Sequence, residues 1–191
     1  MLRSSWKRVA LAAVALAMAV ALPAAAQATR DGFSLGANYV ADRSNAYPGT
    51  CGCFTLQGGG VTATLDLPYR LAAVADFTMV HASTVPGSNY GLGLATYMAG
   101  AQYRYPVHQV TPYGQALIGT VHGFDSVFPG SSSTTANSFA FEIGAGTEYR
   151  IDRSFSVRIL EMDYLRTNLP NNTSSSWQNH LKFVSGVIYH F

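Results

Sequence analysis

Apolar and polar residues alternate through the last segment of the chain, 181–191. The apolar and aromatic positions are Leu181, Phe183, Val187, Tyr189 and Phe191. The positions between them include Lys182, Val184, Gly186, Ile188 and His190. Because neighbouring side chains of a strand point to opposite faces, the first set shares one face. A single apolar face that ends on an aromatic residue suits a barrel wall facing lipid, although an ordinary edge strand shares the pattern.

The same period of two recurs in seven earlier segments. We predict strands over 33–41, 58–67, 71–80, 90–105, 110–122, 137–150 and 154–165, separated by turn-forming residues. The clearest is 137–150, where Phe139, Phe141 and Ile143 oppose Glu142 and Gly144. The last segment brings the count to eight, an even number typical of single-chain bacterial barrels.

Two of these segments have irregular patterns. In 110–122, Gln115 and His122 fall on opposite faces, so the pattern leaves the register of this strand open. In 154–165, the alternation changes phase at Leu160 and Glu161, which indicates a β-bulge.

The connections alternate strictly between short and long. The short ones are 68–70, 106–109 and 152–153, and the long ones, rich in Ser, Asn, Gly and Pro, are 42–57, 81–89, 123–136 and 166–177. Short turns at one end and long loops at the other are the arrangement of outer-membrane barrels, and a soluble sandwich is not expected to keep this asymmetry. We therefore predict an all-β fold, an eight-stranded antiparallel transmembrane β-barrel.

The N-terminal segment 1–26 is typical of a secretory signal peptide. Arg3, Lys7 and Arg8 precede an apolar run over 9–22, and Pro23 and three alanines give a cleavage site before Gln27. A membrane helix is the alternative, but about fourteen apolar residues are too few to span a bilayer comfortably. We predict a cleaved signal peptide at 1–26 and a barrel domain at 27–191.

Charge and hydropathy are consistent with this division. The chain has twelve basic and ten acidic residues, and cleavage removes three of the basic ones. The remainder is close to neutral, so its charge gives no indication of nucleic-acid binding. It also has no further apolar run long enough for a membrane helix, so a membrane-spanning form must be a closed barrel.

The segment 27–191 resembles the small OmpA/OmpX-type outer-membrane β-barrel family. The resemblance rests on the last strand, the rhythm of strands and loops, and the tyrosines near strand ends that would form an aromatic girdle: Tyr69, Tyr103, Tyr105, Tyr149 and Tyr189. It implies a bacterial outer-membrane location, with lipid and lipopolysaccharide as surroundings. It also implies that Val187, Tyr189 and Phe191 mark the chain for the barrel-assembly machinery. The family's peptidoglycan-binding domain is not expected after Phe191.

Charged residues on the polar faces would occupy the lumen of such a barrel. They are Asp66, Asp76, Arg104, Glu142, Glu148, Arg158 and Lys182, and Glu148 is expected to be solvated near the rim together with Arg150. An eight-stranded barrel has room only for side chains, and an isolated buried ion is costly. We therefore expect Arg158 and Lys182 to face carboxylates of neighbouring strands, Glu142 foremost, in a network that fills the lumen.

Two further groups of residues have some chemical potential. Cys51 and Cys53 lie in the first long loop, where a strained disulfide within the loop is favoured over the alternatives, free thiols or a link to another chain. His122, Asp125 and Ser126 are candidates for acyl chemistry on lipid, although residues so close in sequence rarely form a triad.

The other titratable residues are expected to be structural or solvated. We expect Asp163 and Tyr164 to form an interfacial pair, and we expect most of the remaining histidines to lie in solvent: His81, His108, His180 and His190. We assign no catalytic residue, no metal site and no cofactor.

The function predicted from these patterns is a structural or surface-interaction role in the outer membrane. The long loops would provide the contact surface, with Tyr47, Phe54, Phe124, Phe128 and Trp177. A lipid A-modifying enzyme and a narrow pore for small solutes are the alternatives. No pattern in the sequence identifies an external ligand.

Overall fold

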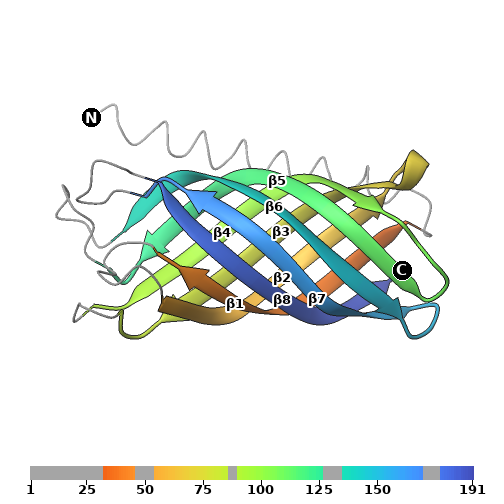
Figure 1. Cartoon of the computed structure of the whole chain (residues 1–191), viewed down its shortest axis with the longest axis horizontal. Helices are drawn as coiled ribbons and strands as arrows, with labels where there is room; N and C mark the ends of the chain where they lie inside the picture. Colours follow the sequence, from red (N-terminus) through yellow and green to blue (C-terminus); the bar gives the residue numbers. More distant parts are fainter. Residues whose placement is uncertain (1–31, 46–53, 86–89, 127–134, 170–176) are drawn as a thin grey trace, which may run out of the picture.

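The computed structural model describes residues 32–45, 54–85, 90–126, 135–169 and 177–191, which form a closed antiparallel barrel. Its strands are β1 (Phe33–Ser44), β2 (Phe54–Asp66), β3 (Leu71–Ala82), β4 (Leu92–Arg104), β5 (Val110–Phe124), β6 (Ala136–Arg150), β7 (Phe155–Thr167) and β8 (Gln178–His190), and the 3-10 turn η1 (Pro68–Arg70) links β2 to β3 (Figure 1). The predicted eight-stranded all-β fold is confirmed. No helix within the described ranges is both long and apolar enough to cross a bilayer.

Each strand pairs with its neighbours in sequence, and the first strand pairs with the last. The β1–β8 ladder runs from Ser34 opposite His190 to Ser44 opposite His180. Phe191 extends this closure, because its backbone N–H donates to the carbonyl of Phe33 at 3.1 Å. A closed sheet has no edge strand, so every strand finds hydrogen-bond partners on both sides.

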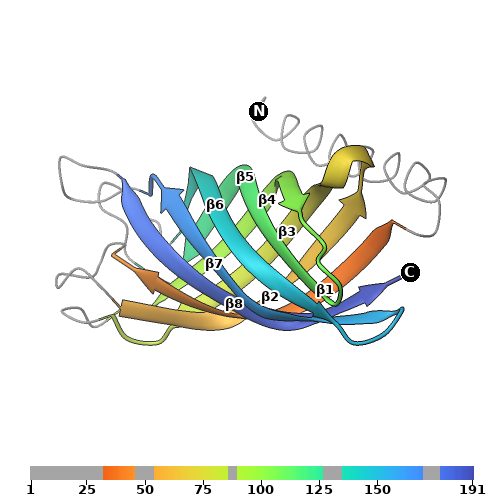
Figure 2. The same ribbon diagram turned by 45° about the vertical axis from the view of Figure 1, so that its right-hand side comes forward.

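The two ends of the barrel differ in their connections (Figure 2). The links β2–β3, β4–β5 and β6–β7 are short and lie at the end that also carries the C-terminus, which we call the short-turn end. The opposite end carries the longer links, and we call it the long-loop end. There the strands extend beyond the predicted bounds, because Phe54 still pairs with Ser44 at the start of β2. Phe54 and Phe124 therefore belong to strands rather than to loops.

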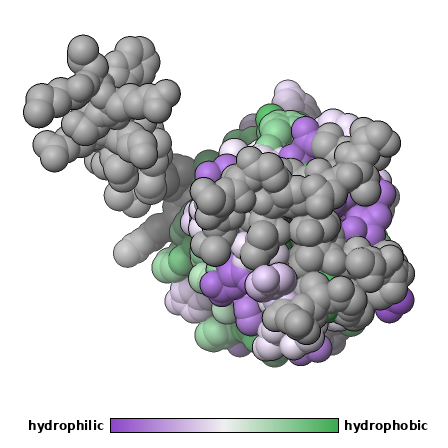
Figure 3. Space-filling view, turned by 90° about the vertical axis from the view of Figure 1, so that its left-hand side faces the viewer, coloured by the Kyte–Doolittle hydropathy of each residue, from purple (hydrophilic) through white to green (hydrophobic). Residues whose placement is uncertain are grey.

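The outer surface is formed by the predicted apolar faces. Its members include Leu35, Val61, Met79, Tyr97, Phe139, Ile143, Ile159 and Val187, which are between 40% and 55% exposed. Charged residues are concentrated on the inner face of the strands. Seen from the long-loop end, the described rim carries both hydrophilic and hydrophobic residues (Figure 3).

The structure resolves both irregular segments. In β5, Gln115 points into the lumen, and Ile118, 60% exposed, marks the outward face that also holds His122. In β7, the pairing with β8 shifts register between Arg158 and Glu161, so the bulge predicted at this point is confirmed. As a result, Ile159 and Leu160 both point outward. Before the bulge the inward residues of β7 have even numbers, and from Glu161 onward they have odd numbers.

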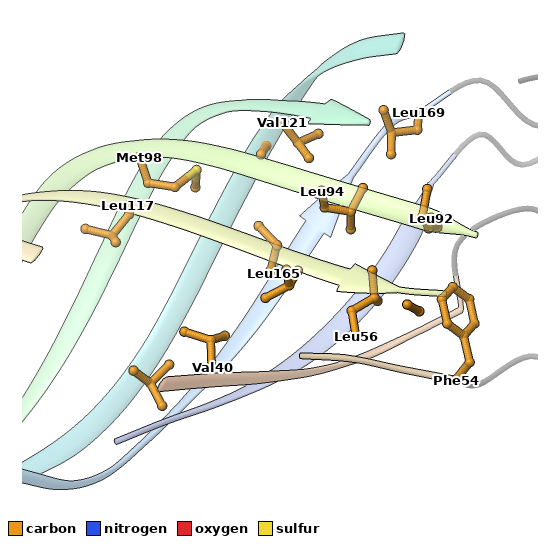
Figure 4. Packing of buried hydrophobic residues seen from close by; sticks show 14 of the residues in the cluster. Val40, Phe54, Leu56, Leu92, Leu94, Met98, Leu117, Val121, Leu165 and Leu169 are labelled. Atoms are coloured by element: carbon orange, nitrogen blue, oxygen red, sulfur yellow. The ribbon is translucent and has the colours of Figure 1, made fainter. Parts of the chain in front are cut away.

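An apolar cluster fills the lumen toward the long-loop end (Figure 4). It includes Val40, Phe54, Leu56, Leu92, Leu94, Met98, Leu117, Val121, Leu165 and Leu169. The sequence analysis named only charged residues for the lumenal network, and it placed Phe54 on the loop surface, whereas Phe54 is buried in this cluster. Tight apolar packing therefore closes the interior at this end.

We expect Leu165→Ala to lower the free energy of unfolding by about 2–5 kcal/mol, because it leaves a cavity inside a closed wall. Leu165 is 1% exposed, whereas the control Leu35 is 40% exposed on the outer surface. Leu35→Ala should cost clearly less, because the surrounding solvent, detergent or lipid refills the space. Equilibrium unfolding in urea measures both, and equal losses would contradict an interior core.

Candidate functional site in the barrel lumen

Charged and polar side chains fill the lumen from the middle of the barrel to the short-turn end. They come from inward positions of all eight strands, which the alternation of each strand directs to the same interior. Their arrangement is therefore set by which strands face one another across the barrel.

Lys182 and Glu142 form an ion pair across the middle of the lumen. The Lys182 Nζ donates to a carboxylate oxygen of Glu142 at 2.7 Å, and both residues are almost fully buried. They come from β8 and β6, which are separated by β7. A buried pair with this geometry is strongly interdependent, because removing one partner leaves an uncompensated charge.

Arg158 is the centre of a second cluster, closer to the short-turn end. Its guanidinium lies 3.3 Å from Glu148 and 3.4 Å from Glu161. It also sits over the ring of Tyr113, with the guanidinium carbon 5.7 Å from the ring centroid. The Tyr113 hydroxyl in turn donates to Glu161. These contacts connect β5, β6 and β7 through the Arg158 guanidinium.

Arg104 connects this cluster to the mouth of the barrel. One guanidinium nitrogen lies 2.6 Å from Glu148, and the other lies 2.8 Å from Asp66. Because Glu148 also contacts Arg158, the carboxylate bridges two arginines. This chain of ion pairs thus runs from Glu161 through Arg158, Glu148 and Arg104 to Asp66 at the short-turn rim, and the Lys182–Glu142 pair is separate from it.

Asp76 is held by hydroxyl groups. Thr62 and Thr78 each donate to its carboxylate at 2.9 Å, and the Asn38 amide donates to the Thr62 hydroxyl at 2.8 Å. No lysine or arginine lies in ion-pair contact with Asp76 within the described residues. Of the seven predicted lumenal residues, six form ion pairs and Asp76 lies in a hydroxyl network, with Asp66 half-exposed at the short-turn mouth. Glu148, expected to be solvated near the rim, is buried, because its carboxylate bridges two arginines.

Asp163 was assigned to the wrong face by the sequence pattern. It is fully buried in the lumen and accepts a hydrogen bond from the Gln115 side chain at 3.0 Å, whereas Tyr164 points outward. The predicted interfacial pair is therefore wrong, because the bulge after Arg158 moves Asp163 to the inner face. A Cβ on Gly144 would overlap the Asp163 carboxylate, so glycine at this position makes room for it.

His180 is an exception to the expectation that most of the remaining histidines are solvated, since it is buried. Its Nδ1 lies 2.9 Å from the Asp42 carboxylate and its Nε2 lies 3.2 Å from the Thr167 hydroxyl. The signal was present in the sequence, because His180 is two residues before Lys182 and shares its face.

The proposed acyl-transfer residues do not come together. The His122 Nδ1 lies 2.6 Å from the Asn137 side-chain oxygen, and Asp125 approaches a different histidine, His81, at 3.8 Å. The Ser126 hydroxyl is buried with no hydrogen-bond partner in the described part of the chain. Nothing in this arrangement would take a proton from Ser126.

Of the other predicted features, some lie on the outer face of the barrel and some lie outside the described residues. Val187, Tyr189 and Phe191 share the outer face, where the Tyr189 and Phe191 rings meet edge to face at 4.8 Å. Their role in assembly stays a prediction. Cys51, Cys53, Tyr47, Phe128 and the segment 1–26 lie outside the described residues. Within the described ranges, no group of three or more His, Cys, Asp or Glu is arranged to hold a metal ion.

A closed barrel with an apolar exterior and paired charges inside has the features of a transmembrane β-barrel. The model of one protein family, the outer membrane protein beta-barrel domain, matches residues 12–191. The chain therefore belongs to this family. No curated protein matches the sequence significantly.

Solved structures of three bacterial outer-membrane barrels are similar in fold. Neisserial surface protein A (NspA) aligns with a TM-score of 0.68 at 17% identity, covering 84% of this chain and 97% of that one. Ail, the attachment invasion locus protein of Yersinia pestis, aligns with a TM-score of 0.53 at 15% identity, over 84% and 99% of the two chains. The N-terminal barrel domain of Pseudomonas aeruginosa OprF gives 0.50 at 17% identity, over 83% and 97%. These similarities establish the fold.

We expect Glu142→Ala to lower the free energy of unfolding by about 3–5 kcal/mol, because it leaves the Lys182 ammonium buried without its partner. Chemical unfolding of the refolded barrel, followed by tryptophan fluorescence, measures this loss. The double variant Glu142→Leu with Lys182→Met should recover most of it, since neither charge is then buried. An unchanged unfolding midpoint in Glu142→Ala would contradict the ion pair's structural role.

Proposed function

We propose that this protein is an integral component of a bacterial outer membrane with a structural or surface-interaction role. Residues 1–26 would direct its export, the long-loop end would face outside and the short-turn end would face the periplasm. The observation that carries the proposal is the reversed polarity of the barrel, apolar outside and charged inside. Hydrocarbon is the environment in which this distribution is favourable.

The exposed aromatic residues support this placement. Tyr69, Tyr103, Tyr105, Tyr149 and Tyr189 lie near the short-turn end and are between 39% and 90% exposed. Tyrosine prefers the interface between lipid and water, because its ring is apolar and its hydroxyl is polar. A girdle at this level would fix the height of the barrel in the bilayer.

The filled lumen favours a structural or surface role over transport. Apolar side chains pack against one another toward one end, and ion pairs occupy the other. Opening a path for solutes would require separating buried charges from their partners, which is costly. One similar barrel, Ail, is named as an attachment invasion locus protein, and a surface-interaction role is compatible with the filled lumen of this chain.

Planar-bilayer recording tests the closed lumen. We expect no stable channel openings from the refolded protein, because the interior is occupied by paired side chains. A heat-modifiability gel on the same sample shows that the barrel was folded, since a closed barrel keeps its compact mobility in detergent until it is boiled. Regular stepwise conductance from folded material would contradict the proposal and favour the narrow pore.

Outer-leaflet lipopolysaccharide is the partner that the long-loop rim fits best. Arg43 on β1 and Arg166 on β7 are both exposed on the outer surface near this end, on the two strands that flank β8. The Arg166 guanidinium lies 4.6 Å from the centre of the Trp177 ring, which holds it at the rim. Guanidinium groups bind phosphate through paired hydrogen bonds, and lipopolysaccharide presents phosphates at this level.

We expect lipopolysaccharide in the vesicle to raise the unfolding temperature of the wild-type barrel, and Arg43→Gln with Arg166→Gln to remove most of that rise. Each exposed contact is worth about 1 kcal/mol. The control is Arg153→Gln, because Arg153 is exposed in the β6–β7 turn at the opposite end. Equal stabilisation of all three proteins would exclude these two arginines as the binding groups.

A further inference from the structure

A cavity of about 300 Å³ opens at the short-turn end between the β2–β3 and β4–β5 turns. Its polar lining comes from Asp66, Arg70, Arg104, His108, Thr111 and Arg150. This volume is at the lower end of the roughly 300–1,000 Å³ typical of small-ligand sites. Three arginines around one small cavity, with a single carboxylate among the lining residues, produce a positive potential.

The three arginines are not equally available to a ligand. Arg104 is already held by Asp66 at 2.8 Å and by Glu148 at 2.6 Å. The Arg150 side chain has no hydrogen-bond or ion-pair partner among the described residues, and its backbone N–H donates to the carbonyl of Gln109 at 2.8 Å. This bond fixes the base of Arg150 beside the β4–β5 turn.

Arg70 faces the same cavity from the β2–β3 turn. Its guanidinium carbon lies 4.5 Å from the centre of the Tyr105 ring, so the ring supports the charge from one side. The guanidinium also donates hydrogen bonds to the side chains of Tyr105 and Tyr103, and because it has five N–H donors, others remain for an anion. Arg70 and Arg150 therefore supply the positive charge that the interior has not neutralised.

The backbone of both turns is unusual in a way that favours a binding role. Tyr69, Arg70 and His108 have φ values of 64°, 65° and 57°, in the left-handed region, although none is glycine. Of the four such residues in the described chain, these three lie in the two turns beside the cavity. Non-glycine residues in this conformation carry a backbone cost and cluster at functional sites.

The cavity lies at the same level as the tyrosine girdle. Tyr69, Tyr103 and Tyr105 project outward around it, and Leu67 and Leu71 are exposed on the same rim. With the short-turn end facing the periplasm, as proposed above, this is the level of the phospholipid headgroups of the periplasmic leaflet. A phosphate attached to a lipid in that leaflet is therefore within reach of the cavity.

We propose that this cavity is a phosphate-binding site, in which Arg70 and Arg150 bind the anion and the Thr111 hydroxyl lies at its side. The source of the phosphate is the headgroup of an anionic phospholipid in the adjacent leaflet, and that assignment rests on the proposed membrane orientation. The binding of phosphate itself rests only on the cavity and its charges. Free inorganic phosphate offers the same chemistry, and the experiment separates the two sources.

The test uses the refolded barrel in a nonionic detergent, titrated by calorimetry with dihexanoyl phosphatidylglycerol and, separately, with inorganic phosphate. We expect the short-chain lipid to bind, and Arg70→Gln and Arg150→Gln each to weaken binding about tenfold, the effect of losing one charge-assisted hydrogen bond. The matched control is Arg153→Gln, which removes an exposed arginine from the neighbouring periplasmic turn, outside the cavity lining.

The outcomes separate this inference from the proposed function. Selective loss in the two cavity variants supports the site, and equal binding of inorganic phosphate would replace the lipid with a free anion as its source. Lack of binding by both probes, or an equal loss in Arg153→Gln, would overturn the site. Heat-modifiable mobility is recorded for every variant, so failure of the site in a folded barrel leaves the proposed function intact. Loss of compact mobility in the wild type would instead count against the proposed function.

Discussion

The pairing of β1 with β8 is the interaction on which the rest of the structure depends. It converts a curled sheet with two open edges into a wall in which every strand is paired on both sides. Only after closure does each strand have an inside and an outside for its whole length. The alternating side chains then separate into two environments, and every other feature of the barrel follows from that separation.

The interior is divided into two parts with different chemistry. Toward the long-loop end, Leu56, Leu94 and Leu165 pack as they would in a soluble core. In the other half, Lys182 forms an ion pair with a carboxylate on β6. Arg158 forms one ion pair with a carboxylate on β6 and one with the carboxylate that follows the bulge on its own strand. Apolar packing excludes water from one half, and paired charges specify how the strands face one another in the other half.

The charged residues outside this network are placed mainly at the ends. Arg43 and Arg166 are exposed near the long-loop end, and Arg70 and Arg150 line the cavity at the short-turn end. The apolar wall between them carries the exposed aliphatic and aromatic side chains. A barrel built this way has two polar rims separated by an apolar band, the distribution expected of a protein with both ends in water and its middle in lipid.

The amino-acid sequence by itself determined which residues face inward in the regular strands, because a period of two assigns faces without any knowledge of the neighbours. Glu142 and Lys182 were recognised as lumenal in this way, and the short and long connections indicated the barrel. Tertiary structure alone decided the register of β5, the inward position of Asp163 after the bulge, and the apolar cluster that contains Phe54. These depend on how strands distant in sequence align across a closed wall, and a local alternation of polar and apolar residues carries no information about that alignment.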